Sequence, residues 1–326
     1  MAECLTGIRC NRPLSKHRLD SFLVGWAGVA ALLLLCVAPI PLTAQDELAA
    51  TLKLDVKLVN VFVNVTDANG AIVGGLTKED FALFEDGRQQ NISLFERQSE
   101  MPLNISLAVD TSGSVKKDLD EEANAARHFV RTILRPQDQM SVIQFATDVR
   151  VLTGFTNKTS QIDGALARLR ADYATALYDA ICSGSAALGK REGRKVLVVV
   201  SDGDDTVQNS TYAEALEAAL RNEVMVYSLI DVPIEASAGR STGGEHALIT
   251  LAEQTGGKHY YVANGNLDKI FQRVSDDLRT EYLLGYYPKD QEPGRQFHRI
   301  TVKIPRAAAD SFEVRNRAGY YTNPAK

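Results

Sequence analysis

Short apolar runs alternate with stretches of helical periodicity from about residue 103 to residue 281, and this alternation constrains the fold more than any other feature. Runs such as "VLVVV" at 196–200 are apolar on both faces of a strand, which is typical of a parallel sheet covered by helices on both sides. The pattern therefore predicts an α/β fold with a doubly wound, mostly parallel sheet of Rossmann type. The predicted strands are 103–109, 140–145, 149–152, 195–200 and 224–230, with a weaker one at 259–262.

The helical stretches between these strands have one apolar face each. In the first, apolar residues from Leu119 to Ile133 recur at steps of three and four, while charged residues take the other side. A last helix is predicted at 271–281. Helices with one apolar face each can pack against both sides of the predicted sheet.

Both ends of the chain after residue 44 have the period-two pattern of strands. Val59, Val61, Val63 and Val65 share one face of a predicted strand, and Asp86-Gly87 predicts a hairpin or tight turn. Strand-like segments return after residue 281 with "YLLGYYP", "QFHRITVKIP" and "SFEVRNRAGYYT". Neither segment is long enough for a sheet core of its own, so we expect the two to pair in one β-sandwich-like module that flanks the α/β domain.

Residues 1–44 have the composition of an export signal. A head with Arg9, Arg12, Lys16 and Arg18 precedes the uncharged stretch 21–44. The strongly apolar core, 22–37, is shorter than the roughly 20 residues of a membrane span, which favours a cleaved signal peptide over an uncleaved signal anchor. Either outcome places the remainder outside the cytoplasm, in the periplasm, at the cell surface or secreted.

The domain organisation that follows has four parts. We expect a signal peptide or anchor at 1–44, an N-terminal β-module at 45–100, the α/β domain at 101–281, and a C-terminal β-segment at 282–326 packed with the N-terminal module.

Charge and cysteine content exclude several classes of protein. The formal net charge of -5 and the absence of a dense basic run argue against nucleic-acid binding. Membrane contact is expected only through the N-terminal segment, if that segment is retained. Cys182 is the single cysteine after residue 44, so the exported part has no internal disulfide.

Polar side chains gather where two of the predicted strands end. Asp110 follows the first strand, and Ser112 and Ser114 follow it at alternate positions of the segment "DTSGS". Asp202 follows the strand 195–200. Carboxylates from neighbouring strand ends would repel each other unless a cation lay between them. The oxygen-only set suits Mg²⁺, Mn²⁺ or Ca²⁺ and does not suit zinc.

These residues resemble a known family. The D-x-S-x-S motif at 110–114, Thr175 in "ATALYDAI" and Asp202 in "SDGDD" are similar to the metal-ion-dependent adhesion site of the von Willebrand factor type A (VWA) domain. The resemblance covers roughly 103–281. The flanking segments, including "GLTKEDFALFEDG" and "YLLGYYP", resemble a group of bacterial exported VWA-related proteins of the acidobacterial type.

The resemblance implies a six-coordinate divalent cation, with Mg²⁺ expected first and Ca²⁺ or Mn²⁺ as alternatives. Ser112 and Ser114 would bind it directly, Thr175 directly or through water, and Asp110 and Asp202 mostly through water. One position would remain for an Asp or Glu of a protein partner. The chain departs from the family in one place: Tyr173-Ala174 stands where glycines often precede the threonine, so we expect a stiffer loop there.

Other interpretations of these motifs fit the sequence less well. An Asx turn or a helix N-cap explains "DTSGS" alone, but not the ordered set with Thr175 and Asp202. An aspartic protease would need a D-[ST]-G motif and a second copy, neither of which occurs, and the H-E-x-x-H motif of metalloproteases is also absent. The sequence therefore predicts a non-enzymatic, metal-dependent adhesion-type protein. The alternatives are a structural envelope component that binds without metal control, and a hydrolase that depends on Ser112.

Overall fold

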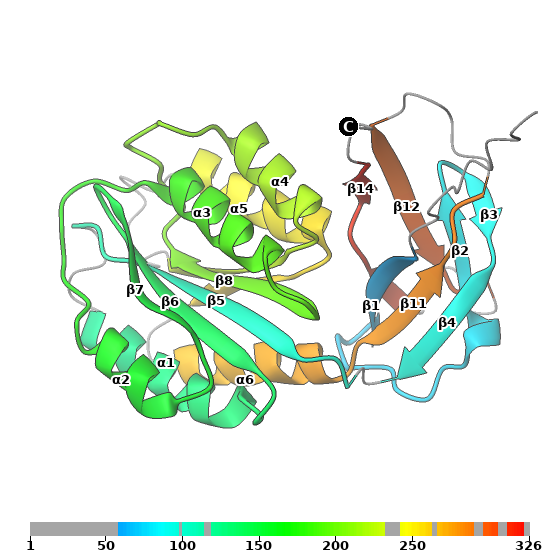
Figure 1. Ribbon diagram of the computed structural model, residues 1–326, viewed down its shortest axis with the longest axis horizontal. Coiled ribbons are helices and arrows are strands. Elements are labelled where there is room, and N and C mark those ends of the chain that lie inside the picture. Colours follow the sequence, from blue (N-terminus) through cyan, green and yellow to red (C-terminus); the bar gives the residue numbers. More distant parts are fainter. Residues whose placement is uncertain are drawn as a thin grey trace, which may run out of the picture. The chain divides into compact units, whose positions relative to one another are not determined.

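The computed structural model describes residues 58–97, 100–113, 119–231, 242–262, 266–289, 296–305 and 312–322 (Figure 1). These residues all belong to one unit that runs from Leu54 to Lys326. The predicted leader, 1–44, and the start of the predicted N-terminal module lie outside the described ranges. Within those ranges, no helix combines the length and the apolar character that crossing a membrane requires.

A six-stranded sheet with the order β10-β9-β8-β5-β6-β7 forms the centre of the α/β part. Its neighbouring strands are parallel, except that β7 runs antiparallel to β6. The predicted fold class, with a mostly parallel sheet, is therefore confirmed. The strands are β5 (Leu103–Asp110), β6 (Gln139–Phe145), β7 (Val149–Thr156), β8 (Arg194–Ser201), β9 (Met225–Asp231) and β10 (His259–Val262).

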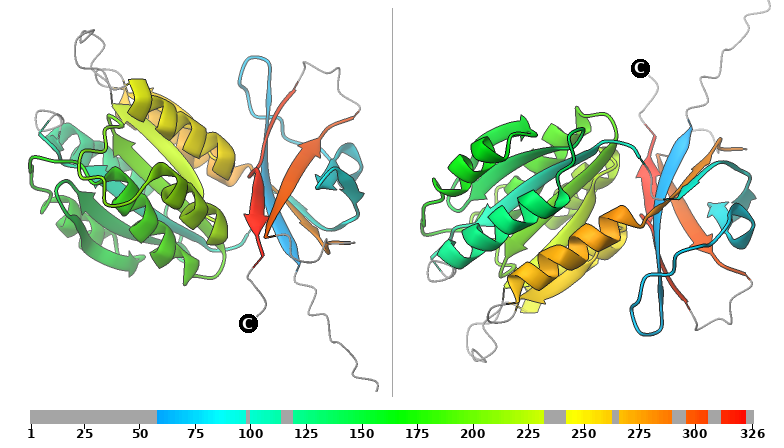
Figure 2. Two further views of the ribbon diagram at one scale, coloured as in Figure 1. Left: turned by 90° about the horizontal axis from the view of Figure 1, so that it is seen from above. Right: turned by 90° about the horizontal axis from the view of Figure 1, so that it is seen from below.

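Helices cover both faces of this sheet (Figures 1 and 2). One apolar cluster joins the sheet to α1, α2 and α6, and a second joins it to α3, α4 and α5. The sheet is thus doubly wound, because the crossover from β5 to β6 and those from β8 to β9 and β10 lead toward opposite edges and place their helices on opposite faces. The helices are α1 (Leu119–Ile133), α2 (Thr159–Leu166), α3 (Leu177–Gly189), α4 (Tyr212–Arg221), α5 (Thr242–Thr255) and α6 (Leu267–Arg279).

Strands from both ends of the described chain form two further sheets, with the orders β13-β1-β11-β4 and β14-β12-β2-β3. Strand β1 pairs with β11 and β13, and β12 pairs with β2, so segments more than 200 residues apart share each sheet. The inward side chains form one apolar core. The elements are β1 (Val59–Asp67), the 3₁₀ helix η1 (Lys78–Asp80), β2 (Ala82–Glu85), β3 (Arg88–Gln90), β4 (Ile92–Arg97), β11 (Tyr282–Tyr286), β12 (Phe297–Lys303), β13 (Phe312–Arg315) and β14 (Gly319–Tyr321).

The predicted turn at Asp86-Gly87 is present and connects β2 with β3. Both residues have positive φ, 50° and 81°, as a tight two-residue hairpin turn requires. Ile92 and Leu94, a short distance after this turn, belong to β4, which pairs with β11 in the other sheet. Periodicity alone does not show whether the strand after this hairpin joins the sheet of β2 and β3 or the other sheet.

A buried ion pair connects the α/β part with the β-sandwich. Arg194 is the first residue of β8, and Glu281 lies between α6 and β11. The Arg194 guanidinium donates to the Glu281 carboxylate and to the Leu278 carbonyl, while Asn64 Nδ2 of β1 donates to Glu281 Oε1 at 3.2 Å. Burial raises the pKa of Glu281, and Arg194 acts in the opposite direction. The pair is therefore held in a water-poor environment where each charge depends on the other.

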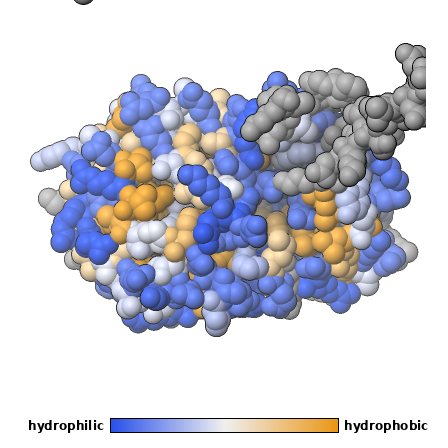
Figure 3. Space-filling view, viewed as in Figure 1, coloured by the Kyte–Doolittle hydropathy of each residue, from blue (hydrophilic) through white to orange (hydrophobic). Residues whose placement is uncertain are grey.

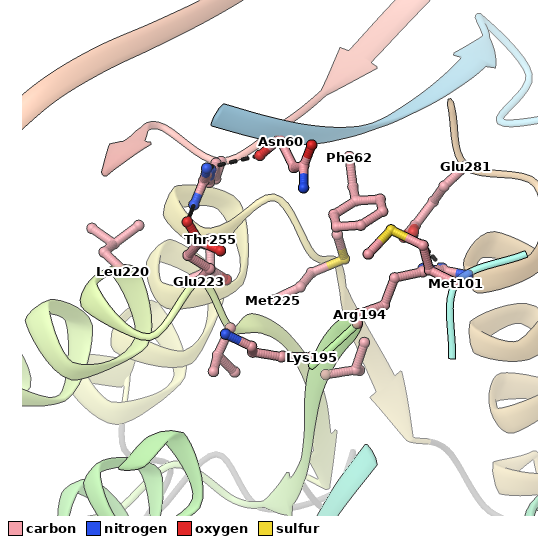
Figure 4. A pocket seen from close by; sticks show the side chains of 14 residues that line it. Asn60, Phe62, Met101, Arg194, Lys195, Leu220, Glu223, Met225, Thr255 and Glu281 are labelled. Carbon is pink, nitrogen blue, oxygen red and sulfur yellow. Dashed lines mark hydrogen bonds and ion pairs between the residues drawn. The ribbon is translucent and has the colours of Figure 1, made fainter. Parts of the chain in front are cut away.

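The same ion pair borders a pocket (Figure 4). Asn60 and Phe62 of β1 lie on one side of it, and Met225 of β9 lies on another. The Arg194 guanidinium also lies 5.5 Å from the centre of the Phe62 ring. The Arg194 guanidinium already donates to protein acceptors. We therefore interpret the pocket as part of the joint between β1 and the α/β sheet and not as a ligand site.

Replacing Arg194 should destabilise the protein strongly. In Arg194→Met, Glu281 keeps its burial but loses its main donor, so we expect the free energy of unfolding to fall by about 3–5 kcal/mol. The double variant Arg194→Met/Glu281→Leu should lose less, because no unpaired charge remains. Urea denaturation would measure both. Arg131→Met, which removes an exposed ion pair with Asp163, is the control and should cost below about 1 kcal/mol. Equal losses in Arg194→Met and Arg131→Met would contradict this assignment.

Candidate functional site

Asp110 is the last residue of β5, and its side chain is only 1% exposed. Its Oδ1 accepts the backbone N–H of Ser112 at 2.8 Å, and its Oδ2 accepts the hydroxyl of Ser201 at 2.7 Å. Burial raises the pKa of Asp110 to about 6, against the opposing effect of these hydrogen bonds, and nearby Asp202 adds to the rise. An ionised carboxylate at this position is therefore costly without a positive charge beside it.

The register of the sheet explains why Asp110 meets Ser201. Strands β5 and β8 are parallel neighbours, and Val109 lies opposite Val200. The next residue along each strand is Asp110 on one and Ser201 on the other. Their side chains therefore meet at the carboxyl edge, where the chain leaves the sheet in loops. We call residues 111–113, 171–176 and 202–207 loop 1, loop 2 and loop 3.

Thr175 lies in loop 2, two residues before α3, and is buried. Its backbone N–H donates to Thr206 Oγ1 at 2.9 Å, and its carbonyl accepts the N–H of Thr206 at 2.9 Å. Loop 2 is also bonded to loop 1, because the N–H of Asp172 donates to the Thr111 carbonyl at 2.8 Å. Loop 2 is thus held between the other two loops.

Asp202 begins loop 3 directly after β8 and is half-buried. Its Oδ1 accepts the N–H of Asp204 at 3.3 Å. Gly203 has a φ of +95°, and a Cβ on it would lie 2.7 Å from the backbone of Gly244 at the start of α5. Only glycine fits this position, which seats loop 3 against α5 and fixes the backbone beside Asp202.

Hydrogen bonds connect all three loops at one edge of the sheet. Ser201 joins the end of β8 to Asp110, Thr111 joins loop 1 to loop 2, and Thr206 joins loop 3 to Thr175. The structure therefore brings four of the predicted site residues to the same edge. They are Asp110, Ser112, Thr175 and Asp202; the fifth, Ser114, lies outside the described residues.

The chemistry of these groups fits a hard divalent cation. The set consists of carboxylates and hydroxyls only, which suits Mg²⁺ or Ca²⁺. The buried carboxylate of Asp110, whose pKa is raised, is a second observation in favour, because a bound cation would offset the cost of its charge. The three-loop arrangement can therefore hold a cation at the end of β5 and β8.

Sequence reasoning missed three residues that support this arrangement. Ser201 and Thr206 bind Asp110 and Thr175, as described above. Asp205 accepts the N–H of Tyr178 in the first turn of α3 at 3.2 Å. Ser201 directly precedes Asp202 in the sequence, which could have marked it as part of the site. Only the strand register shows that its partner is Asp110.

A second group of ionisable side chains lies in the β-sandwich, where ligand atoms of Glu85, Asp86 and His298 come within 4.8 Å of one another. His298 Nδ1 is 2.8 Å from Asp86 Oδ2, and the hydroxyls of Tyr286 and Tyr320 both donate to Glu85 Oε2. These contacts connect β2, β11, β12 and β14. Because protein groups already bind the carboxylates, we assign this group to the stability of the sandwich.

The fold and the carboxyl-edge arrangement define an α/β domain of the type that binds ligands at its sheet edge. Residues 105–204 match the family model of the von Willebrand factor type A domain. The matched segment contains Asp110, Ser112, Ser114, Thr175 and Asp202. Residues 105–204 are thus similar to a VWA domain, as the motifs of the sequence predicted. The comparison with curated proteins gives no match.

Solved structures of low sequence identity match parts of this chain. BatB from Bacteroides thetaiotaomicron is 20% identical, with a TM-score of 0.45, over 54% of this chain and 97% of that one. A von Willebrand factor type A protein from Catenulispora acidiphila is 10% identical, with a TM-score of 0.47, over 82% and 75%. The PilB minor pilin from Streptococcus sanguinis is 15% identical, with a TM-score of 0.44, over 56% and 62%.

Removing the Ser201 hydroxyl should weaken the junction between β5 and β8. Ser201→Ala takes one donor from the buried Asp110 carboxylate, so we expect the free energy of unfolding to fall by about 1–3 kcal/mol. Urea denaturation in the presence of EDTA would measure this loss without cation effects. Ser160→Ala, at an exposed position of α2, should change stability by less than about 0.5 kcal/mol. If Ser201→Ala proved as mild as Ser160→Ala, the hydrogen bond would not have the importance assigned to it.

Proposed function

We propose that this chain is an exported, non-enzymatic binding protein that captures an acidic side chain of another protein through a divalent cation. The observation that carries the proposal is the convergence of Asp110 and Asp202 at the ends of adjacent strands, with the side chains of Ser112 and Thr175 on the connecting loops. The VWA match over 105–204 supports a role in protein interaction or adhesion. Export rests on the composition of residues 1–44.

Each group has a distinct task in this proposal. The hydroxyls of Ser112, Ser114 and Thr175 would be the direct ligands, and Asp110 and Asp202 would orient bound water. Mg²⁺, when bound, supplies an electrophilic centre with a free position for a partner carboxylate. Hydroxyl ligands carry no charge, so they leave the cation able to attract that carboxylate. The bonds between the loops hold these groups in place before any partner arrives.

Nothing in this arrangement requires a catalytic role for the serines. Ser112 donates its backbone N–H to Asp110, and no histidine contributes to the hydrogen bonds described for the three loops. Activation of a serine nucleophile needs a base within hydrogen-bond reach. We therefore propose binding without turnover, in which the serines act as ligands.

Cation binding can be tested directly on the full chain. Isothermal titration calorimetry with MgCl₂ should give one site per chain, and Asp110→Ala should weaken it by at least about tenfold, because that variant removes the buried acid. Glu217→Ala removes an exposed acid on α4 and should leave the affinity unchanged. Equal Mg²⁺ affinity in Asp110→Ala and wild type would rule out the proposed site.

Partner capture separates the proposal from its alternative, an envelope component that docks without metal control. Pull-downs from native extracts, compared in Mg²⁺ and in EDTA, should retain a partner only with Mg²⁺ and only with an intact Asp110. A partner that remains bound in EDTA and to Asp110→Ala would support the alternative.

A further inference from the structure

Tyr173 is the most exposed large apolar side chain among the described residues, with 94% of its surface accessible. The others in this class are Ile72, Val151, Tyr261 and Tyr287, none above 59%. On the face shown in Figure 3, hydrophilic residues predominate and apolar ones form separate patches. Scattered apolar residues of this kind are normal, but an aromatic ring almost wholly in water gains nothing from folding.

The position of Tyr173 connects it with the proposed cation site. It lies in loop 2, two residues before Thr175, and its own carbonyl faces loop 1: a Cβ on Gly113 would lie 3.9 Å from it. Gly113 directly follows Ser112. The exposed ring therefore projects from the backbone that borders the site on one side.

The backbone that carries Tyr173 is held on both sides. The N–H of Tyr173 donates to Asp172 Oδ1 at 2.8 Å, and the N–H of Asp172 donates to the Thr111 carbonyl. Thr175 is bonded to Thr206 on the other side. A ring with two rotatable side-chain bonds on a fixed backbone loses little conformational entropy when a partner covers it.

We infer that Tyr173 is a partner-contact residue, which selects segments that carry an apolar side chain next to the acidic residue captured at the cation site. This inference rests on the proposed function. An apolar neighbour is favoured over a basic one because burial of ring surface outweighs a cation–π contact at an exposed position. Tyrosine is also among the residue types that most often dominate the binding energy of protein interfaces.

The test uses the full chain in MgCl₂ and fluorescent twelve-residue peptides with one central Asp, flanked on both sides by Leu, by Ser or by Lys. Fluorescence polarisation should show the Leu-flanked peptide binding at least about tenfold more tightly than the Ser-flanked one. In Tyr173→Ala this preference should disappear, while Tyr173→Phe keeps it, because the ring and not the hydroxyl makes the contact. Mg²⁺ affinity by calorimetry should be the same in all three proteins.

Tyr287→Ala, which removes a half-exposed tyrosine outside loop 2, is the matched control and should bind all peptides as wild type does. A preference for Leu that persists in Tyr173→Ala, or a preference for Lys or Ser in wild type, would overturn the inference about Tyr173 while leaving cation-dependent capture intact. Absence of Mg²⁺-dependent binding for every peptide in wild type would instead count against the proposed function, and the role of Tyr173 would fall with it.

Discussion

The in-register parallel pairing of β5 with β8 is the constraint on which the rest of the structure depends. Because Val109 lies opposite Val200, the residues that follow each of them, Asp110 and Ser201, meet at the carboxyl edge of the sheet. A shift of one residue would turn each side chain of β8 to the other face and disrupt both apolar clusters. The packing of the core therefore also positions the site.

The other end of β8 has a different role, because Arg194 there binds Glu281 and so connects the sheet with the β-sandwich. Glu281 lies between α6 and β11, and Asn64 of β1 holds its second oxygen. One strand thus has a structural ion pair at its start and a proposed binding site just past its end. The joint with the sandwich is therefore made at the end of β8 opposite to the carboxyl edge.

Much of this arrangement was predictable from residue patterns. Near-continuous apolar strands indicated a covered parallel sheet, and the rule that strand carboxyl ends meet at one edge grouped Asp110 with Asp202. The last helix was predicted at 271–281 but runs from Leu267 to Arg279, because amphipathic periodicity does not mark where capping ends a helix. Ser201 and Thr206 were missed because their partners lie more than 30 residues away, and only the strand and loop packing brings them close.

The sequence by itself determined the type of each main element and the polar residues at the strand ends, because local periodicity and turn chemistry act within a few residues. Only the tertiary structure decided which strands are neighbours, that β1 pairs with both β11 and β13, and that Arg194 meets Glu281. It also decided that Tyr173 projects into solvent beside Thr175. These outcomes depend on contacts between distant segments, whose complementarity exists only once the core has packed.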